Sequence, residues 1–260
     1  MSGVATDAER SRSFGAVAAD YDRLRPSPAP EALEWLLPQR RDLVVDVGAG
    51  TGLFSRALAS RARHVVAVEP DPRMRKVLQD RSPEVEAIAG SGEAIPLPDA
   101  SADGVFASSA WHWMDSQKAI PEVARVLRDG GRFGVIWTGR DPESDWLRAD
   151  EWFREAARDA DPFSGETLAH RCSGGRERAL PDGGLFTNID TATFRFTRPM
   201  MPADLVEMLT TYSRVIMAPA EERERGRARA AAALAELFPG ADQIDVPLRS
   251  RCWRADRIPR

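Results

Sequence analysis

The stretch DVGAGTG (46–52) lies between the apolar run LVV (43–45) and the helix-like stretch LFSRALAS (53–60). Its three glycines stand at alternate positions and contribute no side chains to a hydrophobic core. Glycine lets the backbone adopt turns that a Cβ would forbid, and it lets a ligand come close. An apolar run, a glycine loop and a helix together indicate the first unit of an open parallel sheet, which binds its ligand at the carboxyl end of that strand.

Composition narrows the class of protein. A chain of 260 residues suits one large α/β domain, or a core domain with a smaller appendage. The net charge of −4 argues against a nucleic-acid backbone as the main partner. Cys172 and Cys252 lie far apart with no CxxC or Cys/His spacing, so we expect free thiols and no metal site. The polar N-terminus and the lack of a membrane-length apolar run predict a cytoplasmic protein without a membrane partner, as a monomer or homodimer.

Short β-branched runs alternate with helical stretches in the first half of the chain, which is the pattern of a parallel sheet flanked by helices. The predicted strands lie at residues 42–48, 64–70, 85–90, 102–110 and 130–137. The second strand is followed by a helix that we expect Asp71 to cap, with Pro72 in its first turn. We expect the fifth strand to begin at the break Gly130–Gly131.

The alternation stops after the fifth strand. Residues 142–160 are charged, contain tryptophan and are predicted to be helical. Further on, two predicted strands (189–199 and 243–256) enclose two predicted helical segments (202–217 and 218–238). At the N-terminus, residues 13–38 read as a short helix, a proline-rich link and a second helix, and this segment is placed to fold over the mouth of the sheet.

An acidic residue ends the second strand. Glu69 lies about 20 residues after the glycine loop, where a carboxylate binds the ribose hydroxyls of a nucleoside. The loop spacing is GxGxG, and Leu53 stands where the third glycine of a dinucleotide fingerprint would be. Asp46 would repel a pyrophosphate but suits the ammonium of an amino acid. S-adenosylmethionine has the adenosine and the amino-acid tail and carries no phosphate, so it fits these observations better than a nicotinamide cofactor.

Four ordered motifs carry a family resemblance: VVDVGAGTG (44–52), VVAVEPDPRM (65–74), GSGEAIPLPDASADGVFASSAWHWMD (90–115) and RVLRDGGRFGVIW (125–137). They resemble class I S-adenosylmethionine-dependent methyltransferases with the methyltransferase type 11 domain, and the His-Trp pair is similar to the trans-aconitate-type branch. The resemblance implies a Rossmann-like α/β fold: a seven-stranded sheet with helices on both faces, its last strand antiparallel, and helical cap insertions. It divides the chain into an N-terminal helical lid (1–40), a cofactor-binding core (41–138) and a part that shapes the substrate site and completes the sheet (139–260).

The resemblance also implies a cofactor site, in which Gly48 and Gly50 line the methionine part and Glu69 binds the ribose. The residues expected at the cofactor are Tyr21, Arg25, Asp46, Gly48, Ala49, Gly50, Glu69, Pro70, Met74, Ser91, Gly92, Glu93 and Ser109. The family often has an aspartate that reads the adenine amino group where this chain has Ser91, so adenine binding would depend more on apolar neighbours such as Met74 and Ile95. The alternative for Glu93 is a structural role in its loop.

His112 is the one histidine at a strand's carboxyl end near the expected methyl donor, and it is the candidate catalytic residue. It can serve as a general base or as a donor that orients a substrate oxygen, and the alternative is a histidine that only holds the loop. We expect His64 and His170 to be structural. The residues expected at the substrate are Trp111, Trp113, Trp137, Trp146 and Tyr212, with the hydrophobic core as the alternative place for each.

Taken together, these features predict an S-adenosylmethionine-dependent methyltransferase that acts on a small organic acceptor, with alignment of the two reactants as its main catalytic device. Whether oxygen, nitrogen or carbon is methylated stays open. Three alternatives remain: a protein of the same fold that uses the cofactor for another reaction, a nicotinamide-dependent oxidoreductase, and a methyltransferase acting on nucleic acid or protein. The acidic balance and the absence of an Asn-Pro-Pro-Tyr-type motif disfavour nucleic acid.

Overall fold

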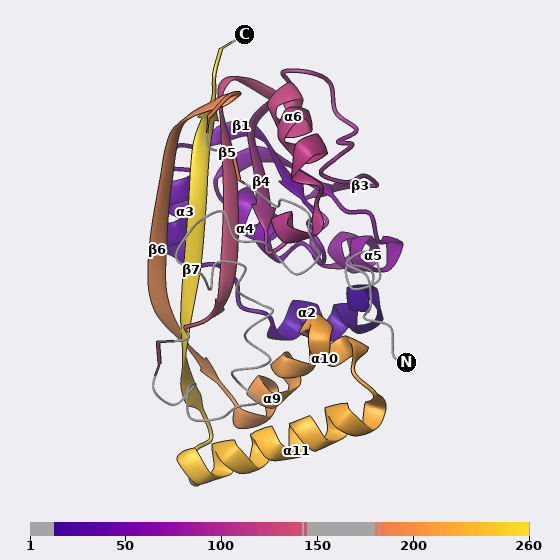
Figure 1. The fold of residues 1–260 in the computed structure, drawn as a ribbon, viewed down its shortest axis with the longest axis vertical. Helices are drawn as coiled ribbons and strands as arrows, with labels where there is room; N and C mark the ends of the chain where they lie inside the picture. Colours follow the sequence, from indigo (N-terminus) through magenta and orange to yellow (C-terminus); the bar gives the residue numbers. More distant parts are fainter. Residues whose placement is uncertain (1–12, 142, 145–179, 182, 260) are drawn as a thin grey trace.

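Seven strands form one mixed sheet in the computed structural model, which describes residues 13–141, 143–144, 180–181 and 183–259 (Figure 1). The strands are β1 (Arg41–Val47), β2 (Ala62–Val68), β3 (Glu86–Ile88), β4 (Ala102–Ser108), β5 (Leu127–Arg140), β6 (Phe186–Met200) and β7 (Ile244–Arg257). Their order is β3-β2-β1-β4-β5-β7-β6. The strands β1 to β5 are parallel, and β7 is antiparallel to both of its neighbours. The predicted seven-stranded sheet with an antiparallel last strand is confirmed.

The sheet turns back on itself beside β1. The chain first builds outward from β1 to β2 and β3, and then returns to place β4 on the other side of β1. Asp46 on β1 accordingly pairs with Ala67 on β2 and with Phe106 on β4. In open α/β sheets this reversal leaves a crevice at the carboxyl ends of the strands, where ligands bind. The loop that follows β1 lies at this crevice.

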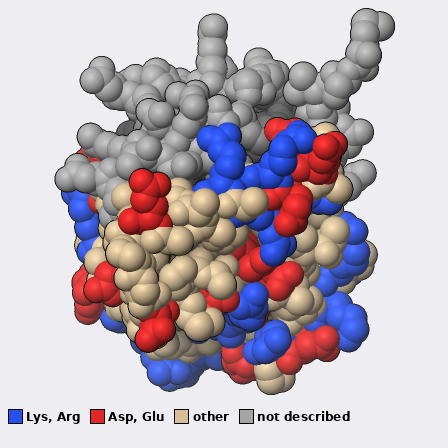
Figure 2. All heavy atoms as spheres, turned by 90° about the horizontal axis from the view of Figure 1, so that it is seen from below, with Lys and Arg blue, Asp and Glu red and all other residues tan. Residues whose placement is uncertain are grey.

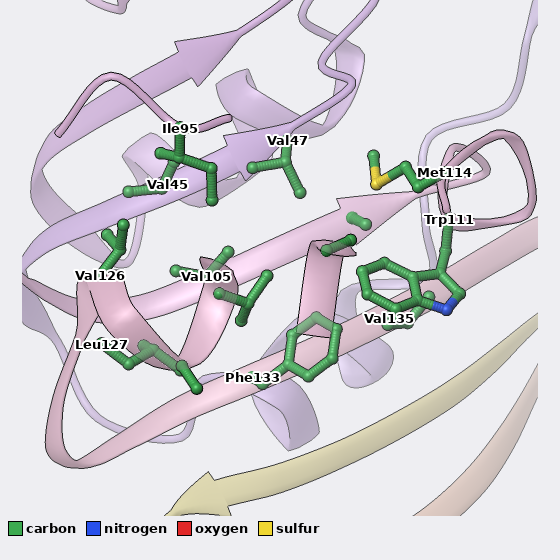
Figure 3. Packing of buried hydrophobic residues seen from close by; sticks show 14 of the residues in the cluster. Val45, Val47, Ile95, Val105, Trp111, Met114, Val126, Leu127, Phe133 and Val135 are labelled. Carbon is green, nitrogen blue, oxygen red and sulfur yellow. The ribbon is translucent and has the colours of Figure 1, made fainter. Parts of the chain in front are cut away.

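Helices cover both faces of the sheet. They are η1 (Phe14–Val17), α2 (Ala18–Leu24), α3 (Pro30–Leu36), α4 (Leu53–Ala59), α5 (Pro72–Arg81), η2 (Trp111–Trp113), α6 (Ser116–Val126), α9 (Pro202–Thr210), α10 (Ser213–Met217) and α11 (Ala220–Leu237). Alternate strand residues point to opposite faces, so Val45 and Val47 pack towards α6 while Val44 packs towards α3 and α4. Figure 3 shows the core on the α6 side, where strand valines meet Phe133 and Trp111. Burial on both faces explains why these strands lack polar alternation.

A third apolar cluster joins the two ends of the chain. Leu24 at the end of α2 packs with α9, α10 and α11 and with the ends of β6 and β7. Figure 1 shows α2 beside α9 and α10, with α11 beyond them. No helix in the described part of the chain is long and apolar enough to cross a membrane.

Three of the differences between the predicted and the observed elements have a local cause. The segment 202–217 is two helices instead of one, because Tyr212 is extended (ψ 139°) between α9 and α10. Strand β4 ends at Ser108, since Ser109 has a left-handed backbone (φ 50°). Strand β5 begins at Leu127, so the predicted break at Gly130 (φ 72°) lies within it as an irregularity of the β4–β5 pairing. The predicted helix at 142–160 lies outside the described residues, apart from Glu143 and Ser144 in a turn.

Candidate active site

A cavity of about 670 Å³ opens at the carboxyl ends of β1, β2 and β4. Its walls come from the glycine loop after β1, the β2–α5 junction, the segment after β3, the β4–η2 loop and the N-terminal helices. Of the residues expected at the cofactor, all except Asp46 line it: Tyr21, Arg25, Gly48, Ala49, Gly50, Glu69, Pro70, Met74, Ser91, Gly92, Glu93 and Ser109. The structure thus brings together side chains from five separate parts of the sequence.

The glycine loop is fixed against the end of β2. The N–H groups of Gly48 and Ala49 both donate to the carbonyl of Val68, at 2.8 and 3.2 Å. Gly48 and Gly50 have φ angles of +68° and +59°, which L-residues with a Cβ rarely adopt. A Cβ on Gly48 would also lie 2.6 Å from the methyl of Ala110. The glycines are therefore required by the backbone path as well as by the space they leave above it.

Glu69 holds the loop and faces the cavity. Its Oε2 accepts from the Gly50 N–H and its Oε1 from the Asp71 N–H, both at 2.8 Å. Burial raises the pKa of this carboxyl, although the two N–H bonds oppose the rise. A carboxylate offers about four acceptor positions, so lone pairs remain for the hydroxyls of a bound ribose.

Asp46 is completely buried beneath the loop and does not line the cavity. Its Oδ2 accepts from the Ser55 hydroxyl at 2.6 Å, while its Oδ1 has no hydrogen-bond partner among the described residues. Burial, with a contribution from the nearby Glu69, raises the pKa of this carboxyl from 3.8 to about 7. A buried carboxylate oxygen without a donor indicates a place for a donor that the protein itself does not supply.

Two methionines give the cavity an apolar part next to the glycine loop, since their terminal methyls lie within 3.4 Å of where a Cβ on Gly48 or Gly50 would be. Met74 from α5 and Met114 after η2 line it, beside Ser91 and Gly92. A Cβ on Gly92 would lie 2.3 Å from the Met114 sulfur, so this glycine is needed where it stands. Glu93 lines the cavity and also accepts from the Asp115 N–H at 2.8 Å, which ties its loop to the start of α6. Ile95, the other expected apolar neighbour, belongs to the core on the α6 side and does not line the cavity.

The N-terminal helices form the roof. Phe14 and Tyr21 line the cavity and meet edge to face with ring centres 5.7 Å apart. The roof is held to the core by the ion pair between Asp22 and Arg56, at 2.7 Å. On the other side Arg23 pairs with Asp204 of α9 at 2.6 Å. These contacts agree with the expectation that this segment folds over the mouth of the sheet.

Arg25, directly after α2, brings a cation to the cavity wall. Its guanidinium carbon lies 3.9 Å from the centre of the Tyr212 ring and 5.1 Å from that of Tyr21. Its Nη2 donates to the carbonyl of Thr211 at 3.2 Å, while its buried Nε has no hydrogen-bond partner among the described residues. The guanidinium is therefore held in place and retains a donor for an anionic group.

The aromatic candidates divide between cavity and core. Trp113 lines the cavity and lies 6.0 Å from the Phe14 ring. Trp111 is 1% exposed and packs on Phe133 in the core. Trp137 is buried beside His112, and Tyr212 lies behind Arg25, so neither lines the cavity. His112 is half-buried next to Trp113 and does not line the cavity in this conformation. Trp146 lies outside the described residues.

Several lining residues were not among the expected ones. They are Phe14, Pro26, Pro28, Thr51, Leu53, Phe54, Asp71, Pro72, Arg73, Ser108, Ala110, Met114 and Thr138. Most stand next to a predicted site residue in the sequence, so the motifs themselves signal them. Phe14 has no such signal, since the nearest expected residue, Tyr21, is seven positions away and Phe14 reaches the wall through the fold of the N-terminal helices.

Sequence comparison identifies the family. Residues 45–135 match the family described as methyltransferase domain. The chain is 38% identical over 250 residues to an uncharacterized methyltransferase of Mycobacterium tuberculosis, a match that covers 95% of this chain and 96% of the relative. This chain belongs to the class I S-adenosylmethionine-dependent methyltransferases.

Solved structures have the same architecture as this methyltransferase. A putative type II methyltransferase from Anaeromyxobacter dehalogenans matches with a TM-score of 0.64 and 25% identity, over 91% of this chain and 99% of the other. Phosphoethanolamine N-methyltransferase 2 of Haemonchus contortus, solved with S-adenosyl-L-methionine, matches with a TM-score of 0.52 and 16% identity, over 99% of this chain and 61% of the other. The second likeness concerns the fold alone.

Within the described residues of the methyltransferase, no group of three or more His, Cys, Asp or Glu side chains is placed to hold a metal ion. Cys252 is a buried free thiol, and burial raises its pKa to about 12.

Proposed function

We propose that this methyltransferase transfers a methyl group from S-adenosylmethionine to a small organic acceptor, and that both bind in the cavity described above. The single observation that carries the proposal is that one cavity is lined by the glycine loop and Glu69 and also by Trp113 and Arg25. Its volume of about 670 Å³ falls within the range of small-molecule sites. Because the cofactor would fill part of this volume, the remaining space suits a compact acceptor.

The residues fit the parts of the cofactor. In this proposal the free Oδ1 of Asp46 accepts from the amino-acid ammonium, directly or through water, and Glu69 accepts from the ribose hydroxyls. Met74 and Met114 give the adenine ring apolar surfaces. When bound, S-adenosylmethionine supplies an electrophilic methyl group on a sulfonium.

The protein's own contribution is alignment. A lone pair on the acceptor forms the new bond to the methyl carbon while the carbon–sulfur bond breaks and its electron pair remains on sulfur. Such a displacement is fastest when the two reacting atoms are held in line at about 3 to 3.5 Å. Trp113 and Phe14 can hold an acceptor by its apolar surface, and the roof of N-terminal helices keeps water from the reacting atoms.

A nucleic-acid substrate is less well supported. Figure 2 shows one face of the molecule, on which Lys and Arg side chains alternate with Asp and Glu over the described residues. Nucleic-acid binding usually needs a stripe of positive charge. The balanced surface and the net charge of −4 support a small acceptor instead.

Calorimetric titration tests the cofactor part of the proposal. Purified protein should bind S-adenosylmethionine and S-adenosylhomocysteine with micromolar affinity and should not bind NAD. Absence of binding by both sulfur compounds would overturn the proposed function. A screen of small acceptors for production of S-adenosylhomocysteine then tests the transfer, and turnover only on protein or nucleic acid would refute the small-molecule assignment.

Arg25 is proposed to bind a carboxylate, either that of the cofactor or that of an acceptor. The variant Arg25→Gln separates the two. If the cofactor's carboxylate binds there, the variant loses affinity for S-adenosylmethionine but not for 5′-methylthioadenosine, which lacks the amino-acid part. If affinity for both is kept, the guanidinium serves the acceptor. Arg63→Gln, at an exposed position on β2 outside the cavity, controls for the loss of one charge.

A further inference from the structure

His112 is fixed by two tryptophans that come from different elements. The 3₁₀ turn η2 carries Trp111, His112 and Trp113, and side chains in such a turn point about 120° apart. Trp111 enters the core and Trp113 reaches the cavity, so His112 takes the remaining direction, towards the end of β5. The Ser109 N–H donates to the Ile136 carbonyl at 2.8 Å, which brings Trp137 next to this turn.

In the hydrogen bond between Trp137 and His112, Trp137 can only be the donor. The indole Nε1 lies 3.3 Å from His112 Nδ1 and donates to it. An indole N–H can only donate, so Nδ1 must present its lone pair. In a neutral imidazole the single proton then belongs to Nε2. An imidazolium would place two N–H groups against each other, so the contact also disfavours the cation.

We propose that Trp137 is a positioning residue that holds His112 in the neutral form with its proton on Nε2, so that neither ring nitrogen of His112 can act as a general base. The Trp113 ring, 4.6 Å from the imidazole and inclined by 46°, supports the same orientation from the cavity side. The inference about the reaction rests on the proposed function, whereas the position of the proton does not.

The consequence for the reaction concerns the acceptor's proton. With Nδ1 bonded to Trp137 and the proton on Nε2, His112 can take no proton from an acceptor. The acceptor atom must therefore arrive without a proton, as a carboxylate or an unprotonated amine does, or lose it to water. This choice decides between the two active roles that the sequence leaves open for His112.

The direct test is long-range proton–nitrogen NMR of the ¹⁵N-labelled full-length protein, above the ordinary titration range of imidazole. The method distinguishes a ring nitrogen that carries a proton from one that does not. The chain has only three histidines, and His64, exposed on β2, is an internal reference. His112→Gln identifies the His112 signals by their loss.

We expect Nε2 of His112 to carry the proton and its Nδ1 signal to differ from that of His64. In Trp137→Phe the Nδ1 signal should move towards that of His64. Trp35→Phe is the matched control, because Trp35 stacks on Arg254 and Phe194 away from the cavity, and it should leave His112 unchanged. A proton on Nδ1, a cationic His112, or identical His112 signals in Trp137→Phe would each overturn the proposal. If Trp137→Phe does not fold, the wild-type spectrum still decides where the proton lies.

Turnover extends the test to the reaction. A glutamine side chain places an N–H donor close to the position of Nε2, so His112→Gln should retain most of the turnover that His112→Ala loses, with cofactor affinity unchanged in both. Because glutamine cannot act as a base, equal loss in the two variants would contradict the conclusion that His112 is not a general base. Failure of S-adenosylmethionine to bind would remove the proposed function and leave the NMR result intact, so the two failures are distinguishable.

Discussion

Replacing Asp46 by asparagine should stabilise the protein without ligand above neutral pH. The carboxyl is fully buried and its pKa is raised from 3.8 to about 7, mainly by burial. One pKa unit is worth about 1.4 kcal/mol, so the charge costs the folded state up to about 4 kcal/mol. The amide of the Asp46→Asn variant keeps an oxygen for the Ser55 hydroxyl and carries no charge.

The sign of the pH dependence follows from the raised pKa. The folded protein holds the Asp46 proton that the unfolded chain releases, so the contribution of Asp46 to stability is complete below about pH 4 and is lost as the pH rises from there through about 7. Wild type and Asp46→Asn should therefore differ little near pH 4 and most above about pH 8. Thermal denaturation measures this, with Tm expected to differ by about 2 to 4 °C for each kcal/mol.

Asp46→Asn should lower the affinity for S-adenosylmethionine, although it raises the stability of the protein without ligand. If Asp46 accepts from the ammonium, Asp46→Asn binds S-adenosylmethionine at least about tenfold more weakly, because a hydrogen bond to a charged group contributes about 1.5 to 3 kcal/mol. Affinity for 5′-methylthioadenosine, which lacks the ammonium, should not change. Binding of S-adenosylmethionine to wild type near pH 6 should also release protons, which calorimetry in buffers of different ionisation heat detects.

Asp103→Asn is a control variant for which we expect the opposite change in stability. Burial alone would raise the pKa of Asp103, but the Leu43 N–H and the Arg128 guanidinium lower it. Its charge therefore stabilises the fold above the ordinary carboxyl pKa, and this variant should lose stability there. The reasoning about Asp46 is refuted if Asp46→Asn is no more stable than wild type above neutral pH, or if it loses affinity for both ligands equally.

Four further variants test the glycine loop, the roof and the role of Glu69. Gly48→Ala and Gly50→Ala both place a Cβ at positive φ, which costs about 1 to 2 kcal/mol each. In Gly48→Ala the new methyl would also lie 2.6 Å from the methyl of Ala110, so this variant should have the lower Tm. Equal Tm values for the two variants would contradict this. Asp22→Asn removes the ion pair with Arg56, and amide exchange in residues 14–24 should become faster while the sheet is unchanged; unaltered exchange would mean that the pair does not hold the roof. Glu69→Ala should raise the Kd for S-adenosylmethionine at least about tenfold, measured by calorimetry, and an unchanged Kd would rule out its role at the ribose.

The first half of the fold could be predicted because its signals are local. Buried parallel strands are continuous apolar runs, and the glycine loop and Glu69 stand at the ends of two of them. The cap of α5 was equally visible, and Asp71 accepts from the Arg73 N–H at 2.8 Å as expected. The residues of the site that follow these strands could therefore be named in advance.

The remainder depends on contacts between distant parts of the chain. No local pattern shows that Tyr212 interrupts a helix, and its ring lies against the guanidinium of Arg25, a residue far away in the sequence. Likewise, the aromatic run around His112 does not reveal which ring enters the core, since the direction of each depends on one 3₁₀ turn. The acceptor side is built from such contacts, and for this reason the substrate could not be predicted as closely as the cofactor.

The position of β7 also has a consequence for synthesis of the chain. This strand lies between β5 and β6, although it is made after both. On the ribosome β6 consequently has no strand to pair with until β7 has left the exit tunnel. The sheet of the nascent methyltransferase is therefore completed in one late step, in which β7 pairs with β5 and β6 pairs with β7. A chain that ends before β7 lacks that strand and also leaves β6 outside the sheet.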